Sequence, residues 1–315
     1  MKPLYRFSFA GAPPVRTVDP GETFVVELPD SDGLGPDLRP LPGACFEDHP
    51  PQCGNPVFGP VFVEGAEPGD ALQIQFLRIE PDRNIARTLL APDHGLVPDA
   101  LLHNTCATLV SGAKPHHVYL WEIRNESAHI VNAIGDKPVS VPVHPFLGCV
   151  STVSPGVPAL SSLLANSHGG NIDHPDLTAG TVLWLPVSVD GGMLYLGDMH
   201  AAQGHGEAAG GGLEISGTAT IRVELCKGMP LKAPRYRTRT GSACLGIGTH
   251  LQTAMQLAIA EMTHWVARSG WNLYDASMMV NQTCELRLGA VTNRYAVVSC
   301  FLGDDKLNGN LLACV

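Results

Sequence analysis

Glycine and proline are unusually dense in this chain, and that density limits the folds open to it. The 315 residues include 34 glycines and 26 prolines, nearly one residue in five, against roughly one in eight in average proteins. Proline breaks the interior of helices and central strands, and glycine favours turns. The chain therefore predicts many short strands joined by turns and disfavours a helical bundle. Its 44% of hydrophobic residues are enough for a folded core without disulfide support.

Alternating apolar and polar residues predict strands through most of the chain. Turn signals recur between these segments, as in a β-sandwich. The clearest single strands are expected at 23–28, 61–63, 71–79 and 213–225. Two hairpins are expected as well. They are 118–123 with 128–134, turned at Asn125-Glu126, and 182–187 with 193–196, turned at Asp190-Gly191-Gly192.

The pattern changes after about residue 248. Apolar residues at helical spacing from Leu251 to Trp265 predict a helix with Thr249 as its N-cap. A second helix is expected from Leu273 to Cys284, capped by Asn272. We expect one domain over residues 1–315, with a mainly β, sandwich-like body over about 1–248 and a smaller C-terminal α/β element over about 249–315. A Pro/Gly/Asp-rich stretch from Asp30 to Pro60 has little periodicity, and loops of that length usually serve function.

Charge and cysteine usage exclude several classes of protein. The formal net charge is −10, without the basic surplus of a nucleic-acid binder. No window approaches 18 apolar residues, so no membrane-spanning helix is expected. The nine cysteines are scattered and form no C-x-x-C pair, which favours reduced thiols. With no secretory signal in residues 1–12, the expected compartment is the cytoplasm.

The densest polar segment follows an apolar strand. It is GDMHAAQGHGE, residues 197–207. If the strand continues, Asp198 and His200 project from the same face, and the glycines allow Glu207 to return toward them. Such oxygen and nitrogen donors suit zinc, manganese, iron or nickel. The alternative, about equally favoured by the spacing alone, is a polar loop whose side chains are satisfied locally.

Two further segments hold candidate ligands. His168 to His174 includes Asn171 and Asp173 beside two glycines, and a turn with local hydrogen bonds explains it equally well. His144 lies between prolines in an apolar run, where a packed histidine is the more common outcome. The chain has no G-x-S-x-G elbow, H-E-x-x-H helix or phosphate-binding glycine loop.

Several blocks together resemble the acetamidase/formamidase family. They are GPVFVEGAEPGD (59–70), GGNID (169–173), LPV (185–187) and GDMHAAQGHGE (197–207). Their order and spacing fit from about residue 55 to the end. The resemblance implies a mostly β fold with a smaller α/β part, a homodimer or higher homo-oligomer, and hydrolysis of formamide or acetamide to ammonia and a carboxylate. It also implies a bound divalent metal, expected to be zinc.

The resemblance assigns roles to particular residues. Asp198, His200 and Asp173 are the expected metal ligands, and Glu207 and Asp173 the expected catalytic groups. The expected substrate-binding residues are Asn171, His144, Gln203 and Glu64. One position departs from the family, because His205 stands where the pattern usually has aspartate. This departure keeps open the alternative of a metal-binding member without amide turnover. A hydrolase of another C–N bond is a further alternative.

Overall fold

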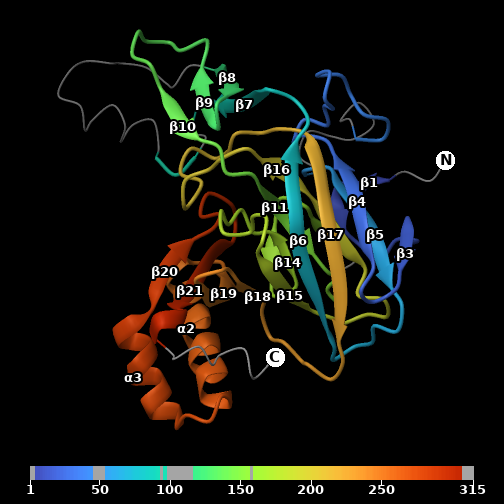
Figure 1. Cartoon of the computed structure of the whole chain (residues 1–315), viewed down its shortest axis with the longest axis vertical. Coiled ribbons are helices and arrows are strands. Elements are labelled where there is room, and N and C mark those ends of the chain that lie inside the picture. The colour runs from blue at the N-terminus through green and yellow to red at the C-terminus, as the bar shows by residue number, and fades with distance from the viewer. Residues whose placement is uncertain (1–3, 45–53, 93–94, 98–115, 157–158, 307–315) are drawn as a thin grey trace.

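The computed structural model describes residues 4–44, 54–92, 95–97, 116–156 and 159–306. Within them the protein is a β-sandwich with a helical element at one end (Figure 1). The larger sheet has eight strands in the order β20–β21–β19–β18–β15–β6–β17–β4. Their bounds are β4 Thr23–Leu28, β6 Ala71–Pro81, β15 Val182–Pro186, β17 Gly217–Cys226, β18 Arg235–Arg237, β19 Gly241–Gly248, β20 Glu285–Leu288 and β21 Ala296–Gly303.

The second sheet has seven strands in the order β1–β5–β16–β11–β14–β13, with β3 parallel to β5. Their bounds are β1 Tyr5–Arg6, β3 Arg16–Val18, β5 Val57–Val63, β11 Phe146–Ser151, β13 Ala165–Asn166, β14 Gly169–Asn171 and β16 Leu194–His200. One hydrophobic cluster contains Ile74 and Ile221 from the larger sheet together with Val150 and Leu196 from this one. Burial between the two sheets therefore forms the main core, and the expected sandwich is confirmed.

A four-stranded sheet extends from the body in the order β10–β9–β8–β7 (Figure 1). Its bounds are β7 Ile85–Leu90, β8 His117–Arg124, β9 Ser127–Ile130 and β10 Ser140–Pro142. The β8–β9 hairpin is the one expected from sequence. Asn125 and Glu126 have φ values of 50° and 60°, and positive φ at both central residues is typical of tight hairpin turns. A small two-stranded sheet pairs β2 (Ser8–Phe9) with β12 (Leu160–Ser161).

The expected hairpin between 182–187 and 193–196 is wrong. β15 belongs to the eight-stranded sheet and β16 to the seven-stranded sheet, so the turn carries the chain from one sheet to the other. A Cβ at Gly191 would overlap the Phe62 ring, which shows how closely this crossover passes the second sheet. Both strands are almost fully buried. Their sequences therefore lack the alternation of apolar and polar residues that would indicate which sheet each strand belongs to.

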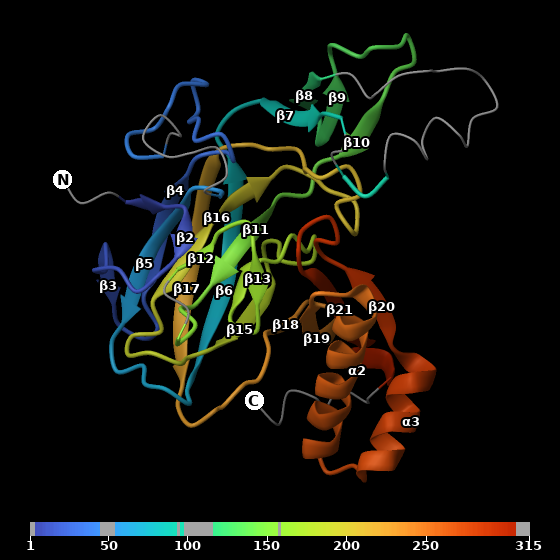
Figure 2. The same ribbon diagram turned by 180° about the vertical axis from the view of Figure 1, so that it is seen from behind.

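Two helices cover the outer side of β19 and β21 (Figure 2). α2 spans Leu251–Arg268 and α3 spans Leu273–Thr283, and a 3-10 turn follows β21 at Asp304–Lys306. Asn272 caps α3 as expected, because its Oδ1 accepts a hydrogen bond from the Tyr274 amide at 2.9 Å. The expected cap at Thr249 is wrong. His250 occupies the N-cap position of α2 and makes no side-chain cap bond. Neither described helix is long and apolar enough to cross a membrane.

Candidate functional site

Asp198 and His200 meet at the end of β16. The strand continues through His200, and His200 Nε2 lies 3.5 Å from Asp198 Oδ1. Both side chains are almost completely buried. The continued strand and the short distance bear out the convergence expected from the D-x-H spacing.

Asp173 reaches the same point from another strand. It follows β14, and β11 pairs with β14 on one side and with β16 on the other. Asp173, Asp198 and His200 each offer one ligand atom, and these atoms lie within 4.8 Å of one another. Among the described residues, Oδ1 of Asp173 has no hydrogen-bond partner, although the atom is buried. Buried polar atoms normally have a partner, so this set of donors can hold a metal ion.

Gly148 leaves the room in which these carboxylates meet. It lies on β11, directly between the two strands that carry Asp173 and Asp198. A Cβ at this position would overlap Asp173 Oδ1 and would lie 2.6 Å from Asp198 Oδ2. A side chain at residue 148 would therefore occupy the space in which the two carboxylates converge.

Glu207 adds a further carboxylate beside the cluster. It is 8% exposed, and Thr292 Oγ1 donates a hydrogen bond to its Oε2 at 3.3 Å. Burial raises the pKa of Glu207 to about 7; His200 opposes this shift, and the neighbouring carboxylates Glu214 and Asp198 add to it. A carboxyl group with a pKa near neutrality can both take and give a proton.

Glu214 contacts His200, and sequence reasoning missed it. Its Oε1 lies 3.0 Å from His200 Nε2, and its Oε2 is buried without a hydrogen-bond partner among the described residues. Burial alone would lower the pKa of His200. The carboxylates of Glu214 and Asp198 raise it by more than burial lowers it, so the pKa of His200 is well above its usual value. Backbone bridges from Glu214 to His200 and to Arg87 hold the segment in place. No local motif marks this glutamate, because its partners are distant in the chain.

Three site carboxylates have left-handed backbone. Asp173, Asp198 and Glu207 have φ values of 44°, 60° and 50°. Positive φ is uncommon outside glycine, and such conformations cluster at functional sites. The three acidic residues of the site thus share an unusual backbone conformation, which Glu126 also adopts in the β8–β9 turn.

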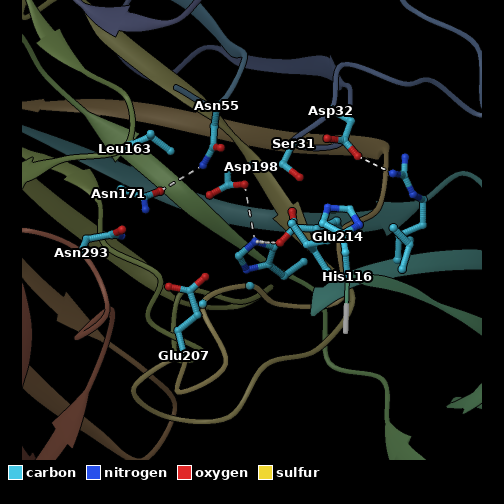
Figure 3. A pocket seen from close by; sticks show the side chains of 16 residues that line it. Ser31, Asp32, Asn55, His116, Leu163, Asn171, Asp198, Glu207, Glu214 and Asn293 are labelled. Carbon is cyan, nitrogen blue, oxygen red and sulfur yellow. Dashed lines mark hydrogen bonds and ion pairs between the residues drawn. The ribbon is translucent and has the colours of Figure 1, made fainter. Parts of the chain in front are cut away.

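Asp198, His200, Glu207 and Glu214 line a cavity of about 350 Å³. Figure 3 shows Asp198 near its centre, Glu207 and Asn293 on one side, and Asp32 and His116 on the other. Asn293 lies between β20 and β21, so the C-terminal α/β element contributes to the site. No residue beyond 207 was expected here from the sequence.

The Asp30 to Pro60 stretch also contributes to the cavity. Ser31, Asp32 and Asn55 line it, which supports the expectation that this long segment serves function. Arg87 Nη2 lies 2.6 Å from Asp32 Oδ2 and ties the segment to β7. Residues 45–53 of the stretch lie outside the described residues.

Known proteins match this chain over the same region. A model of the acetamidase/formamidase family matches residues 156–300, which include Asp173, Asp198, His200 and Glu207. Over these residues the chain resembles the acetamidase/formamidase family.

Solved structures and a curated relative are similar to this chain as well. An acetamidase from Bacillus halodurans is 26% identical to this chain, with a TM-score of 0.78, and the match covers 96% of this chain and 96% of the acetamidase. An acetamidase from Yersinia enterocolitica is 25% identical, covers 96% of this chain and 89% of its own, and has a TM-score of 0.80. A Schizosaccharomyces pombe protein provisionally named a formamidase is 25% identical over 225 residues, 56% of this chain and 54% of that protein. The chain thus matches about half the length of that relative.

The position that departs from the acetamidase/formamidase pattern lies outside the ligand cluster. His205 is exposed, and its Nδ1 lies 2.9 Å from the carbonyl oxygen of Leu288. The triad within the described residues consists of Asp173, Asp198 and His200. The histidine therefore leaves these three candidate ligands unchanged.

The expected substrate-binding residues divide into two groups. Asn171 lines the cavity, and Gln203 lies behind it, with Nε2 donating to the backbone oxygen of Asp173 at 2.9 Å. His144 is exposed and lines a separate depression with Arg239. Glu64 is exposed in the turn after β5, whereas the cavity meets the chain before that strand, at Asn55. The structure therefore gives no support to substrate contacts by His144 or Glu64 in this cavity.

Proposed function

We propose that the protein is an amidase that hydrolyses a short aliphatic amide, formamide or acetamide, to ammonia and a carboxylate with a divalent metal. The observation that carries this proposal is the buried cluster of Asp173, Asp198 and His200 beside a third acidic group, Glu207. Asp198, His200 and Glu207 line one cavity. The match of residues 156–300 to the acetamidase/formamidase family supports the reaction class.

The donor atoms fit a divalent cation. Asp173 Oδ1 is buried and unpartnered within the described part of the chain, and Gly148 keeps the space beside it open. Two carboxylates and one imidazole are ligands that zinc accepts, and three protein ligands leave a position open for catalysis. When bound, such an ion supplies Lewis acidity that activates an amide carbonyl and a water molecule.

Glu207 moves the proton in this proposal. Its carboxylate takes a proton from the water that attacks the amide carbon. The resulting carboxylic acid then gives that proton to the leaving nitrogen as the C–N bond breaks, which yields ammonia and the carboxyl product. The pKa of about 7 suits a group that must act in both directions. Thr292 holds the Glu207 carboxylate through its hydroxyl.

Amide side chains supply polar contacts for a small polar substrate. Asn55, Asn171 and Asn293 all line the cavity, and a carboxamide offers both a donor and an acceptor. Asn171 already uses one amide hydrogen on Asp173, so its second hydrogen is the one available to a substrate oxygen.

We also propose a homo-oligomer, on the strength of the family resemblance alone. Light scattering coupled to size-exclusion chromatography tests this directly. A mass of a single 33.4 kDa chain would contradict the proposal.

An ammonia-release assay tests the function. The purified protein is assayed on formamide, acetamide, longer amides and cyclic amides, with metal analysis of the same preparation. Release from formamide or acetamide that stops with chelator supports the proposal. Bound metal with no turnover supports the non-catalytic alternative. Turnover confined to longer or cyclic amides supports a hydrolase of another C–N bond.

A further inference from the structure

Cys149 lies directly behind the candidate metal centre. It is on β11, where it pairs with Asn171 of β14 on one side and with Gly197 of β16 on the other. Its side chain is fully buried. Asn171, Asn55 and Asp198 line the cavity, whereas Cys149 is not among the residues that line it. The thiol is thus placed to act on the neighbours that face the cavity.

The thiol contacts one particular atom of Asn171. Cys149 Sγ has three acceptors within reach: Asn171 Oδ1 at 2.8 Å, the carbonyl oxygen of Ser162 at 3.2 Å and Asp198 Oδ2 at 3.6 Å. Its single hydrogen points best to the nearest of them, Asn171 Oδ1. Asn55 Nδ2 donates to the same oxygen at 3.3 Å (Figure 3). On its other side, Asn171 Nδ2 donates to Asp173 Oδ2 at 2.7 Å. Every polar atom of this amide therefore has a defined partner.

The network favours one orientation of the Asn171 amide. A flipped amide would place its NH₂ group against the two donors, Cys149 and Asn55. It would also place its carbonyl oxygen against the carboxylate of Asp173, where neither oxygen can donate. Both changes leave buried polar groups unpaired, which is costly.

The orientation of Asn171 determines which oxygen of Asp173 is free. Oδ2 is held by Asn171, whereas Oδ1 has no partner among the described residues and points toward Asp198 across Gly148. We propose that Cys149 is a positioning residue that, through Asn171, aims Asp173 Oδ1 at the metal. This inference rests on the metal centre of the proposed function. Outer partners that orient ligands in this way commonly change metal affinity by roughly 10–100-fold when they are replaced.

The test uses zinc binding rather than activity alone. Protein stripped with a chelator is titrated with Zn²⁺ against a chromophoric competitor, for the unchanged chain, Cys149→Ala and Cys149→Ser. Serine keeps an O–H donor, and alanine removes the donor. Cys244→Ala is the matched control, because Cys244 is also fully buried but lies on β19 in the other sheet. Thermal unfolding of each variant reports whether the fold is retained.

We expect Cys149→Ala to weaken zinc binding by about 10–100-fold, and Cys149→Ser and Cys244→Ala to stay within about threefold of the unchanged protein. Wild-type affinity in Cys149→Ala would overturn the inference while leaving the proposed function intact. Equal losses in Cys149→Ala and Cys244→Ala, or in the alanine and serine variants at residue 149, would overturn it as well. Failure of the unchanged protein to bind zinc would overturn both this inference and the metal-dependent function.

Discussion

Glu214 Oε1 lies 3.0 Å from His200 Nε2, so the only imidazole in the metal-ligand cluster of the described residues is held by a carboxylate from outside that cluster. Asp198 approaches the same nitrogen at 3.5 Å. Two acidic groups thus share one histidine nitrogen. A cation bound to this nitrogen would replace its proton and would lie beside both carboxylates, whose negative charges favour it.

Glu214→Gln tests this relationship. The variant keeps the side-chain shape but removes the negative charge beside His200. We expect zinc affinity, measured by competition with a chromophoric chelator, to fall about 10–100-fold. Glu27→Gln, at an exposed position of β4, is the matched control. Unchanged zinc affinity in Glu214→Gln would show that Glu214 does not support the centre.

Gly148→Ala tests the space between the carboxylates. The added methyl group would overlap Asp173 Oδ1 and approach Asp198 Oδ2, so we expect zinc binding to fall at least about 100-fold while the circular dichroism spectrum stays that of a β protein. Gly135→Ala is the control, because a Cβ there meets nothing within 4 Å. Normal zinc binding by Gly148→Ala would place the metal elsewhere.

The sequence predicted much of this site because its decisive residues are close together in the chain. Asp198 and His200 are two residues apart in β16, and this spacing was enough to predict that they converge, although Asp198 departs from regular strand backbone with a φ of 60°. Glu207 follows within one glycine-rich loop. The Asn272 cap and strand β4 were similarly local and were confirmed.

The residues that sequence reasoning missed depend on strand order. Cys149, Asn55 and Glu214 reach the site only because β11 lies between β14 and β16 and because Glu214 forms a backbone bridge with His200. Strand order is set by long-range burial, which local alternation does not encode. The wrong hairpin between 182–187 and 193–196 has the same cause.

Glu207→Gln separates proton transfer from metal binding. Glutamine keeps the size of the side chain and can still accept the Thr292 hydrogen bond, but it cannot take a proton. We expect ammonia release to fall about 10²–10⁴-fold with zinc content unchanged. Thr23→Ser is the control variant, because Thr23 is exposed on β4 and its replacement should leave both ammonia release and zinc content unchanged. Ammonia release within a few-fold of that of the unchanged protein would show that Glu207 does not transfer the proton.

Asp176→Asn tests a pH-dependent contribution to stability. Burial alone would raise the pKa of Asp176. Its contacts with His174, Tyr236 and Arg287 lower the pKa by more than burial raises it, so the pKa of Asp176 is below the usual 3.8. The folded state therefore favours the charged form, so the stabilisation is present above pH 3.8 and is lost as pH falls through the folded pKa. Arg287 and Tyr236 donate to this carboxylate at 2.8 and 2.7 Å.

We expect urea unfolding to show Asp176→Asn less stable by about 1.5–3 kcal/mol at neutral pH. The difference from the unchanged protein should shrink once the pH falls below about 4, because the carboxyl group of the unfolded chain takes up its proton there and the native one follows at lower pH. A difference that stays constant from pH 7 to pH 3 would mean that the charge of Asp176 contributes nothing.

The most direct measurement is ammonia release from formamide and acetamide by one preparation in three states: as purified, stripped with chelator, and stripped then reloaded with zinc. His200→Ala is carried through the same steps. In the unchanged protein, the account predicts turnover that disappears on stripping and returns with zinc. In His200→Ala, it predicts turnover at least about 100-fold below that of the zinc-loaded unchanged protein in all three states. Turnover that survives stripping, or full activity in His200→Ala, would contradict it.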